Sequence, residues 1–226
     1  ALPFILFPSP AGFFADRFAK RNVIVLIKFI ELFFMLAGTV CLANFASWGP
    51  MPLALIMFLL AAQSAFFSPV LNGILPEYFN EKEISNVNGL KEMLTMIAVI
   101  VGMCAGIIAK ALAGSELYKC GIFLSCFSLT AFIMSLAIVP GLPANPLAKW
   151  SWNWFKGYID GFKLVKEHKP ILLCVLGDAF FTAIGTGIQA LLIVHAKYAL
   201  HLTKEIEQGI IQLGLAFGVG FGCYLA

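Results

Sequence analysis

The sequence is dominated by long uninterrupted apolar runs, and their length limits the folds that are open to it. A helix needs about 20 apolar residues to cross the ~30 Å hydrocarbon core of a bilayer. Residues 1–15 look like the end of one such run, and six further runs reach this length: 23–45, 51–75, 93–113, 120–140, 171–196 and 206–226. No segment alternates as a half-buried strand does. The pattern predicts an all-α membrane protein, and we expect the chain to be an internal fragment of a longer one.

The composition agrees with a bilayer environment. Charged residues make up 12% of the chain, about half of the share found in soluble domains. A formal net charge of +3 is too small to indicate a nucleic-acid partner. The six cysteines lie singly within apolar runs, so we interpret them as small hydrophobic residues and expect no metal site, disulfide or cofactor.

The distribution of lysine and arginine predicts the orientation and the domain organisation. Ten of the 15 basic residues lie in the connections 16–22, 76–92 and 141–170, which assigns these connections to the cytoplasm. The longest connection divides the chain into an N-terminal half at 1–140, a cytoplasmic loop at 141–169 and the start of a second half at 170–226. Aromatic residues at four-residue spacing in this loop predict an amphipathic helix at the membrane interface; an ordinary positively charged linker is the alternative.

Ionisable residues within the apolar runs are the first candidates for function, because a charge in hydrocarbon costs at least about 3 kcal/mol. Lys28 and Glu31 are three residues apart, so they can pair along one helix face. That intramembrane ion pair could be purely structural. Asp178 has no such neighbour, and we expect it to face a wet cavity, pair with another helix or carry a proton. No catalytic set of residues is recognisable, so an enzyme is not expected.

Uncharged polar and small residues mark two further helix faces. Ser64, Ser68 and Asn72 share one stripe in the run 51–75, with Gln63 beside it, and Gln189 lies on the segment of Asp178. These six residues (Gln63, Ser64, Ser68, Asn72, Asp178, Gln189) are the predicted lining of a substrate pathway, although serines also bond backbone carbonyls in ordinary membrane helices. Gly102 and Gly106 form a G-x-x-x-G pair, which predicts close helix packing or gating.

A short charged segment resembles a known signature. Residues 12–21, GFFADRFAKR, resemble the G-x-L-A-D-R-x-G-R-R/K motif that the major facilitator superfamily carries between its second and third helices. The resemblance implies two six-helix halves that rock about a central site, with this chain covering helix two to about helix eight. It also implies a conformational latch, in which Asp16 accepts hydrogen bonds from a helix N-terminus and nearby bases form ion pairs; its residues are Gly12, Asp16, Arg17, Lys20 and Arg21.

A second set of residues is similar to the prokaryotic lysophospholipid transporter branch, which includes forms fused to an acyltransferase. The matching elements are Ser68-Pro69, the sequence GILP at 73–76, the sequence NGL at 88–90, and the two pairs described above. Two features depart from the pattern. The run 51–75 contains no arginine, and Val70 and Leu71 stand where the branch often has a lysine.

The resemblance implies a secondary transporter in a bacterial inner membrane that moves lysophospholipid by alternating access. Its expected partners are membrane lipids, a lysophospholipid or other amphiphilic substrate, a possible coupling ion and a possible fused or associated acyltransferase. Two alternatives stay open at this point. The chain could belong to an exporter of small amphiphilic or drug-like molecules, or it could be the membrane half of a bifunctional lipid acyltransferase.

Overall fold

The computed structural model describes residues 3, 7–114, 116–141, 145 and 154–198, and single positions between 214 and 222. Within these residues every regular element is a helix and no strand occurs. The helices are α2 (Pro8–Arg17), α3 (Lys20–Ala43), α4 (Phe45–Trp48), α5 (Met51–Tyr78), α6 (Glu81–Ala113), α7 (Tyr118–Leu136), α8 (Trp154–Glu167) and α9 (Lys169–Tyr198). The all-α prediction is confirmed.

Five of the described helices are long and apolar enough to cross a bilayer: α3, α5, α7 and most of α6 and α9. They correspond to the first five complete runs predicted from the sequence. The sixth run, 206–226, lies mostly outside the described residues. Short α4 and Gly49, whose φ of +70° suits glycine, turn the chain between α3 and α5.

The connection predicted at 76–92 differs most from the structure. Helix α5 continues to Tyr78 and α6 already begins at Glu81, so most of this acidic segment is helical. Asn80 and Glu83 form a capping box, in which the backbone N–H of Asn80 donates to Glu83 Oε2 at 3.2 Å. Such a box satisfies two backbone donors at a helix start, and acids in the first turn favour the helix dipole. These local interactions start α6 well before its apolar stretch.

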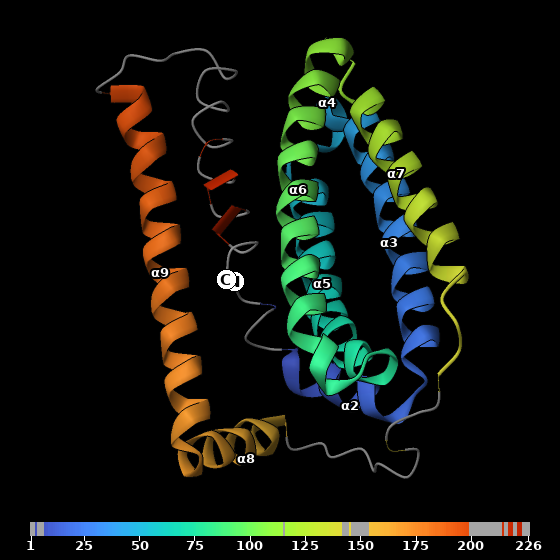
Figure 1. Ribbon diagram of the computed structural model, residues 1–226. Coiled ribbons are helices and arrows are strands. Elements are labelled where there is room, and N and C mark those ends of the chain that lie inside the picture. The colour runs from blue at the N-terminus through green and yellow to red at the C-terminus, as the bar shows by residue number, and fades with distance from the viewer. Residues whose placement is uncertain are drawn as a thin grey trace. The chain divides into compact units, whose positions relative to one another are not determined.

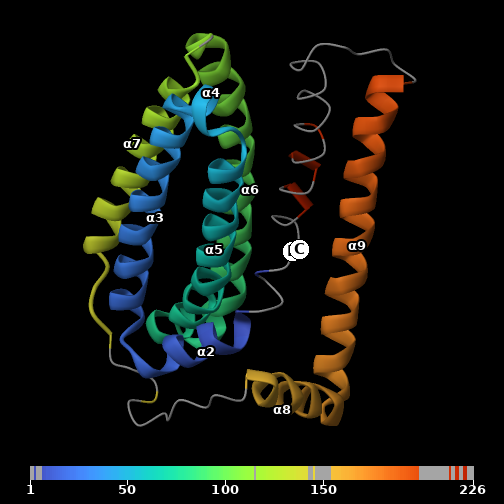
Figure 2. The ribbon, with the colours of Figure 1, turned by 180° about the vertical axis from the view of Figure 1, so that it is seen from behind.

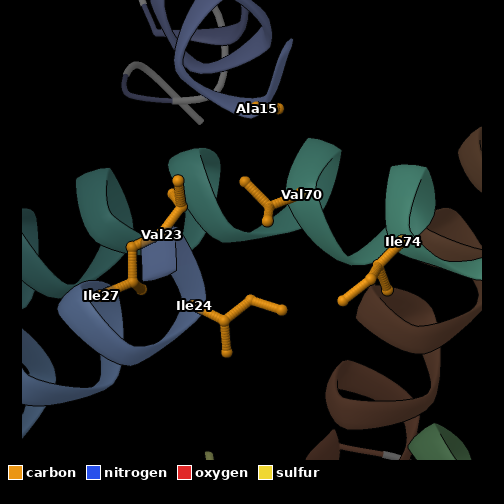
Figure 3. Packing of buried hydrophobic residues seen from close by; sticks show 6 residues of the cluster. All are labelled: Ala15, Val23, Ile24, Ile27, Val70 and Ile74. Atoms are coloured by element: carbon orange, nitrogen blue, oxygen red, sulfur yellow. The ribbon is translucent and has the colours of Figure 1, made fainter. Parts of the chain in front are cut away.

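The first compact unit comprises residues 1–84 and 109–155. Helix α3 packs against both α5 and α7, and α2 packs against α5 and α3 (Figure 1). The view from behind also shows α3 alongside α7 (Figure 2). Apolar side chains from α2, α3 and α5 form one buried cluster where these helices meet (Figure 3); its members are Ala15, Val23, Ile24, Ile27, Val70 and Ile74.

The contact between α3 and α7 is especially close. A Cβ added at Gly121 would lie 2.6 Å from Thr39 Oγ1 and 2.8 Å from the Thr39 Cα. Beside it, the hydroxyls of Thr39 and Ser125 are 3.2 Å apart, within hydrogen-bond distance. Ser125 and Ser128 are buried in this contact region of α7. Small residues therefore let the two backbones approach, as is usual where lipid provides no hydrophobic driving force.

The second compact unit comprises residues 85–108 and 156–226. Its described helices are the middle of α6, nearly all of α8, and α9. Only His168 separates α8 from α9, and its carbonyl accepts the amide N–H of Leu172 at 3.1 Å. The domain boundaries expected from the sequence, at 140 and 170, stay predictions.

Candidate functional site

A polar network joins α3 and α5 inside their apolar stretches. Lys28 Nζ donates to Glu31 Oε2 at 2.8 Å, and Gln63 Nε2 donates to the same oxygen at 2.9 Å. Lys28 and Glu31 lie one turn apart on α3, whereas Gln63 reaches them from α5. A single carboxylate oxygen thus holds one cationic and one neutral donor from two helices.

The environment of this network suits a charged pair within a span. The Lys28 ammonium lies 4.7 Å from the centre of the Phe67 ring, where the ring face attracts a cation. The side chains of Lys28 and Glu31 keep 20% and 18% of their exposure. Both side chains are therefore mostly buried but still partly accessible, and their formal charges cancel.

A second cluster, which we call the charged end, lies where α3 begins and α5 ends. Lys20 pairs with Glu77 across these helices, and the Lys20 side chain is only 7% exposed. Gly73 makes room for the lysine, because a Cβ there would lie 2.9 Å from Lys20 Cε. Burial of the whole lysine stem leaves its ammonium dependent on Glu77 for compensation.

The charged end also receives the C-terminal end of α7. Arg21 donates from Nε to the carbonyl of Ile138 and from a terminal nitrogen to that of Leu136, both at 3.0 Å. The Tyr78 hydroxyl donates to the carbonyl of Val139. The last carbonyls of a helix lack intrahelical partners and carry the negative end of its dipole, so a guanidinium stabilises them. Residues from α3 and α5 therefore fix the end of α7.

The other charges of the signature have different surroundings. The Asp16 carboxylate is exposed, and its backbone carbonyl accepts the amide N–H of Asn145 at 2.8 Å. The Arg17 guanidinium lies 5.6 Å from the ring of Phe13 and 5.9 Å from that of Phe18. The contacts of Lys20 and Arg21 thus lie within the first unit, and the role expected for the Asp16 carboxylate stays a prediction.

Comparison with known families matches residues 1–226 to the Major Facilitator Superfamily. The chain belongs to this superfamily. Membership in this family, together with the five apolar helices among the described residues, identifies a multi-pass membrane protein of a transporter family.

The chain is similar to several curated bacterial relatives, all called lysophospholipid transporter LplT. It is 26% identical to that of Klebsiella pneumoniae over 97% of this chain and 52% of the relative. The proteins of Serratia proteamaculans and Escherichia coli are 24% and 25% identical over 96% and 97% of this chain, and 53% and 52% of their own lengths. The chain therefore spans about half the length of these relatives. No solved structure is a significant match.

The structure places one of the four pathway residues predicted on α5 in the polar network that joins α3 and α5. Gln63 joins the network with Lys28 and Glu31. Ser64, Ser68 and Asn72 are exposed along α5, within a helix that contains Pro69 and Pro76. Exposed polar side chains on a membrane helix are consistent with an aqueous pathway, and their role stays a prediction.

The remaining predicted pathway residues lie on α9, in the second unit. Asp178 is exposed on this helix. Gln189 belongs to the same helix, but its side chain is outside the described residues. Among the residues that the structure describes, no group of three or more His, Cys, Asp and Glu side chains could hold a metal ion.

The glycines show a contrast between the predicted and the observed close contacts. A Cβ added at Gly102, Gly106 or Gly12 would meet no atom within 4 Å. The closest observed approach is instead at Gly121, where the Thr39 backbone lies opposite. The packing or gating role of Gly102 and Gly106 stays a prediction.

Three residues of the charged end were not predicted from the sequence as site residues: Glu77, Tyr78 and Gly73. Glu77 had a detectable signal, since an acid directly after an apolar run was assigned to the same side as Lys20. Opposite charges on one side of neighbouring spans are natural partners. The contacts of Tyr78 and Gly73 had no such signal, because they depend on how α5 is turned toward α3 and α7.

Proposed function

We propose that the protein is a secondary transporter that moves lysophospholipid across the bacterial cytoplasmic membrane by alternating access. The observation that carries this proposal is the partly exposed Lys28–Glu31 pair inside the apolar stretch of α3, held by Gln63 of α5. The relatives named lysophospholipid transporters give the substrate class. Superfamily transporters bind substrate between their halves near the middle of the bilayer.

The pair is chemically matched to a zwitterionic headgroup. The substrate phosphate would form an ion pair with the Lys28 ammonium, and the substrate ammonium would form one with the Glu31 carboxylate. Both the pair and the headgroup are neutral overall, so this exchange of partners changes no net charge in a region of low dielectric constant. Phe67 and Gln63 would keep the two side chains in position. This arrangement would also supply a cation near Ser68-Pro69, where Val70 and Leu71 replace the lysine common in the branch.

The polar residues of α5 and α9 complete the proposed pathway. Ser64, Ser68 and Asn72 would solvate the headgroup along α5, and Asp178 and Gln189 would do so from α9. Asp178 would meet a cationic headgroup or carry a coupling proton. Asp178→Asn should then lower transport severalfold while Asp178→Glu retains part of it, and normal transport by the asparagine variant would remove Asp178 from the pathway.

We further propose that the charged end acts as a latch during alternating access. Its contacts join α3, α5 and the end of α7, so these helices would move as one body when the halves rock. The Asp16 carboxylate, Arg17 and Gly12 would complete the latch by contacting the other half in the state closed to the cytoplasm.

The decisive experiment is transport of labelled lysophosphatidylethanolamine by the full-length protein in proteoliposomes. Saturable, protein-dependent movement between leaflets is expected, with loss of rate in Lys28→Met. Movement of a cationic amphiphile but no lysophospholipid would favour an exporter instead. A gene that continues after residue 226 into a soluble acyltransferase would favour a bifunctional acylation system, in which this chain delivers the lipid.

A further inference from the structure

Helix α8 presents an exposed apolar face near the start of a membrane span. Ile159 and Phe162 are 53% and 69% exposed, and Val165 is half-buried. These residues are three apart, so they lie on one face of the helix.

The other side of α8 carries charged residues and one exposed leucine, Leu164. Lys163 and Glu167 are exposed there. Lys166 is exposed on the same side as Ile159 and Phe162, one turn after Phe162. A lysine in this position can lay its aliphatic stem along apolar surroundings and still keep its ammonium in water.

The span that follows α8 in the chain keeps this helix close to one end of a membrane crossing. Helix α9 begins at Lys169, and its first 24 residues form a candidate span. Only His168 lies between the two helices, and the chain turns a corner there (Figure 2). A helix tethered in this way stays beside the bilayer at high effective concentration.

We propose that α8 is a docking surface for anionic phospholipids of the leaflet on its side of the membrane. Its apolar face enters the boundary between headgroups and acyl chains, and its lysines contact the lipid phosphates. Helices with this division of residues lie in the plane of the interface, and basic residues strengthen their attraction to anionic lipid. The surface is separate from the substrate pathway and anchors the connection between the two halves.

Spin labels in the full-length protein test the position of the apolar face. Labels are attached at Phe162→Cys and, as a matched control on the charged side, at Glu167→Cys, with the native cysteines replaced. In nanodiscs containing phosphatidylglycerol, the label at 162 should be several times more accessible to oxygen than to a water-soluble nickel complex, and the label at 167 should show the reverse. Equal access of both labels to water overturns the proposal. A label at 162 shielded from both reagents also overturns it, because the face then packs on protein.

A second comparison tests whether the lysines of α8 and anionic lipid attract each other. Attraction to anionic lipid contributes roughly a fivefold preference for each lysine near the surface. The oxygen preference at 162 should therefore fall when phosphatidylcholine replaces phosphatidylglycerol, and Lys163→Gln with Lys166→Gln should abolish this difference between lipids. Lys82→Gln removes one charge from the exposed first turn of α6 and should change nothing. An oxygen preference that is independent of both lipid charge and lysines would overturn the assignment to anionic lipid.

Discussion

The Cα of Thr39 lies 2.8 Å from the point where a side chain on Gly121 would begin. This distance is too short for a Cβ, and the opposing atom is backbone, so an added methyl group can be accommodated only if α3 and α7 move apart. Overpacking of this kind costs about 1–3 kcal/mol. We expect Gly121→Ala to lower the free energy of unfolding by this amount, measured by denaturant titration in mixed micelles.

The matched control for this change is Gly102→Ala. It makes the same substitution in a long helix where an added Cβ meets no atom within 4 Å. Alanine is favoured over glycine inside helices by about 0.5–1 kcal/mol, so this variant should be neutral or slightly more stable. Equal losses in both variants would show that the short approach at Gly121 does not determine stability. Lost transport with normal stability in Gly102→Ala would support the predicted gating role.

The Lys20–Glu77 pair predicts an asymmetry between its two partners. The lysine side chain is 7% exposed and the glutamate side chain 26%, so removal of the acid leaves the more buried charge without compensation. Glu77→Gln should therefore destabilise more than Lys20→Met. The free energy of unfolding lost in Glu77→Gln should lie between the ~1 kcal/mol of an exposed pair and the ~3 kcal/mol of a buried one.

The double variant separates burial from pairing. When both charges are removed, no buried ion is left unpaired, so the combined change should cost less than the sum of the single changes. Denaturant titrations of the four proteins measure this coupling. Strict additivity would mean that the two side chains do not stabilise each other in solution.

The sequence predicted those features that depend on nearby residues. The lengths of the apolar runs located five spans, because crossing a bilayer requires a fixed number of apolar residues. The proximity of Lys28 and Glu31 followed from their spacing on one helix. The start of α6 was missed although it is also local, because the acidic segment was interpreted by charge alone and the Asn80–Glu83 capping box was not recognised.

The contacts between helices could not be predicted in the same way. Gln63 meets Glu31 from 32 residues away. This contact depends on how α5 is rotated toward α3, and the polar stripe of α5 does not say which neighbouring helix it faces. The same reason explains Gly121. The Gly102–Gly106 pair was the predicted packing site, whereas the closest approach among the described glycines is at Gly121, which is followed by the buried Ser125 and Ser128.

Loss of the acid should affect transport in the Lys28–Glu31 pair but not in the exposed Glu116–Lys119 pair. Glu31→Gln leaves Lys28 without a counterion inside a span, where an unpaired charge is costly. Transport of lysophosphatidylethanolamine should fall at least tenfold. The proposed headgroup site also predicts a loss of binding. The lipid should raise the unfolding temperature of the original protein, as ligands of the folded state do, but not that of the variant.

Glu116→Gln is the control for this prediction. Glu116 pairs with Lys119 at the same three-residue spacing, but outside the apolar stretch. The hydrogen bond from Lys119 and its positive charge lower the pKa of the Glu116 carboxyl, and such exposed pairs contribute little to stability. Transport and lipid-induced stabilisation should both be retained. Retained lipid stabilisation in Glu31→Gln as well would reduce the Lys28–Glu31 pair to a structural role.

The Asp16 carboxylate gives the clearest test of the latch. Its backbone carbonyl already has a partner, Asn145, and the side chain itself is exposed. Asp16→Asn keeps the shape of the residue and the carbonyl, so the free energy of unfolding should change by less than about 0.5 kcal/mol. If the carboxylate closes the cytoplasmic side by accepting hydrogen bonds from a helix N-terminus, the same variant should lose most of its transport.

Membrane insertion, unfolding and lysophospholipid transport measured on one preparation distinguish the outcomes. Low transport with normal insertion and stability is the result expected for a latch, and Asp16→Glu should recover part of the rate because it restores the charge. Full transport by Asp16→Asn would leave the segment as an orientation signal alone. We expect normal insertion, because the bases beside Asp16 already favour the cytoplasm. Loss of insertion in Asp16→Asn would mean that the carboxylate acts on topology and not as a latch.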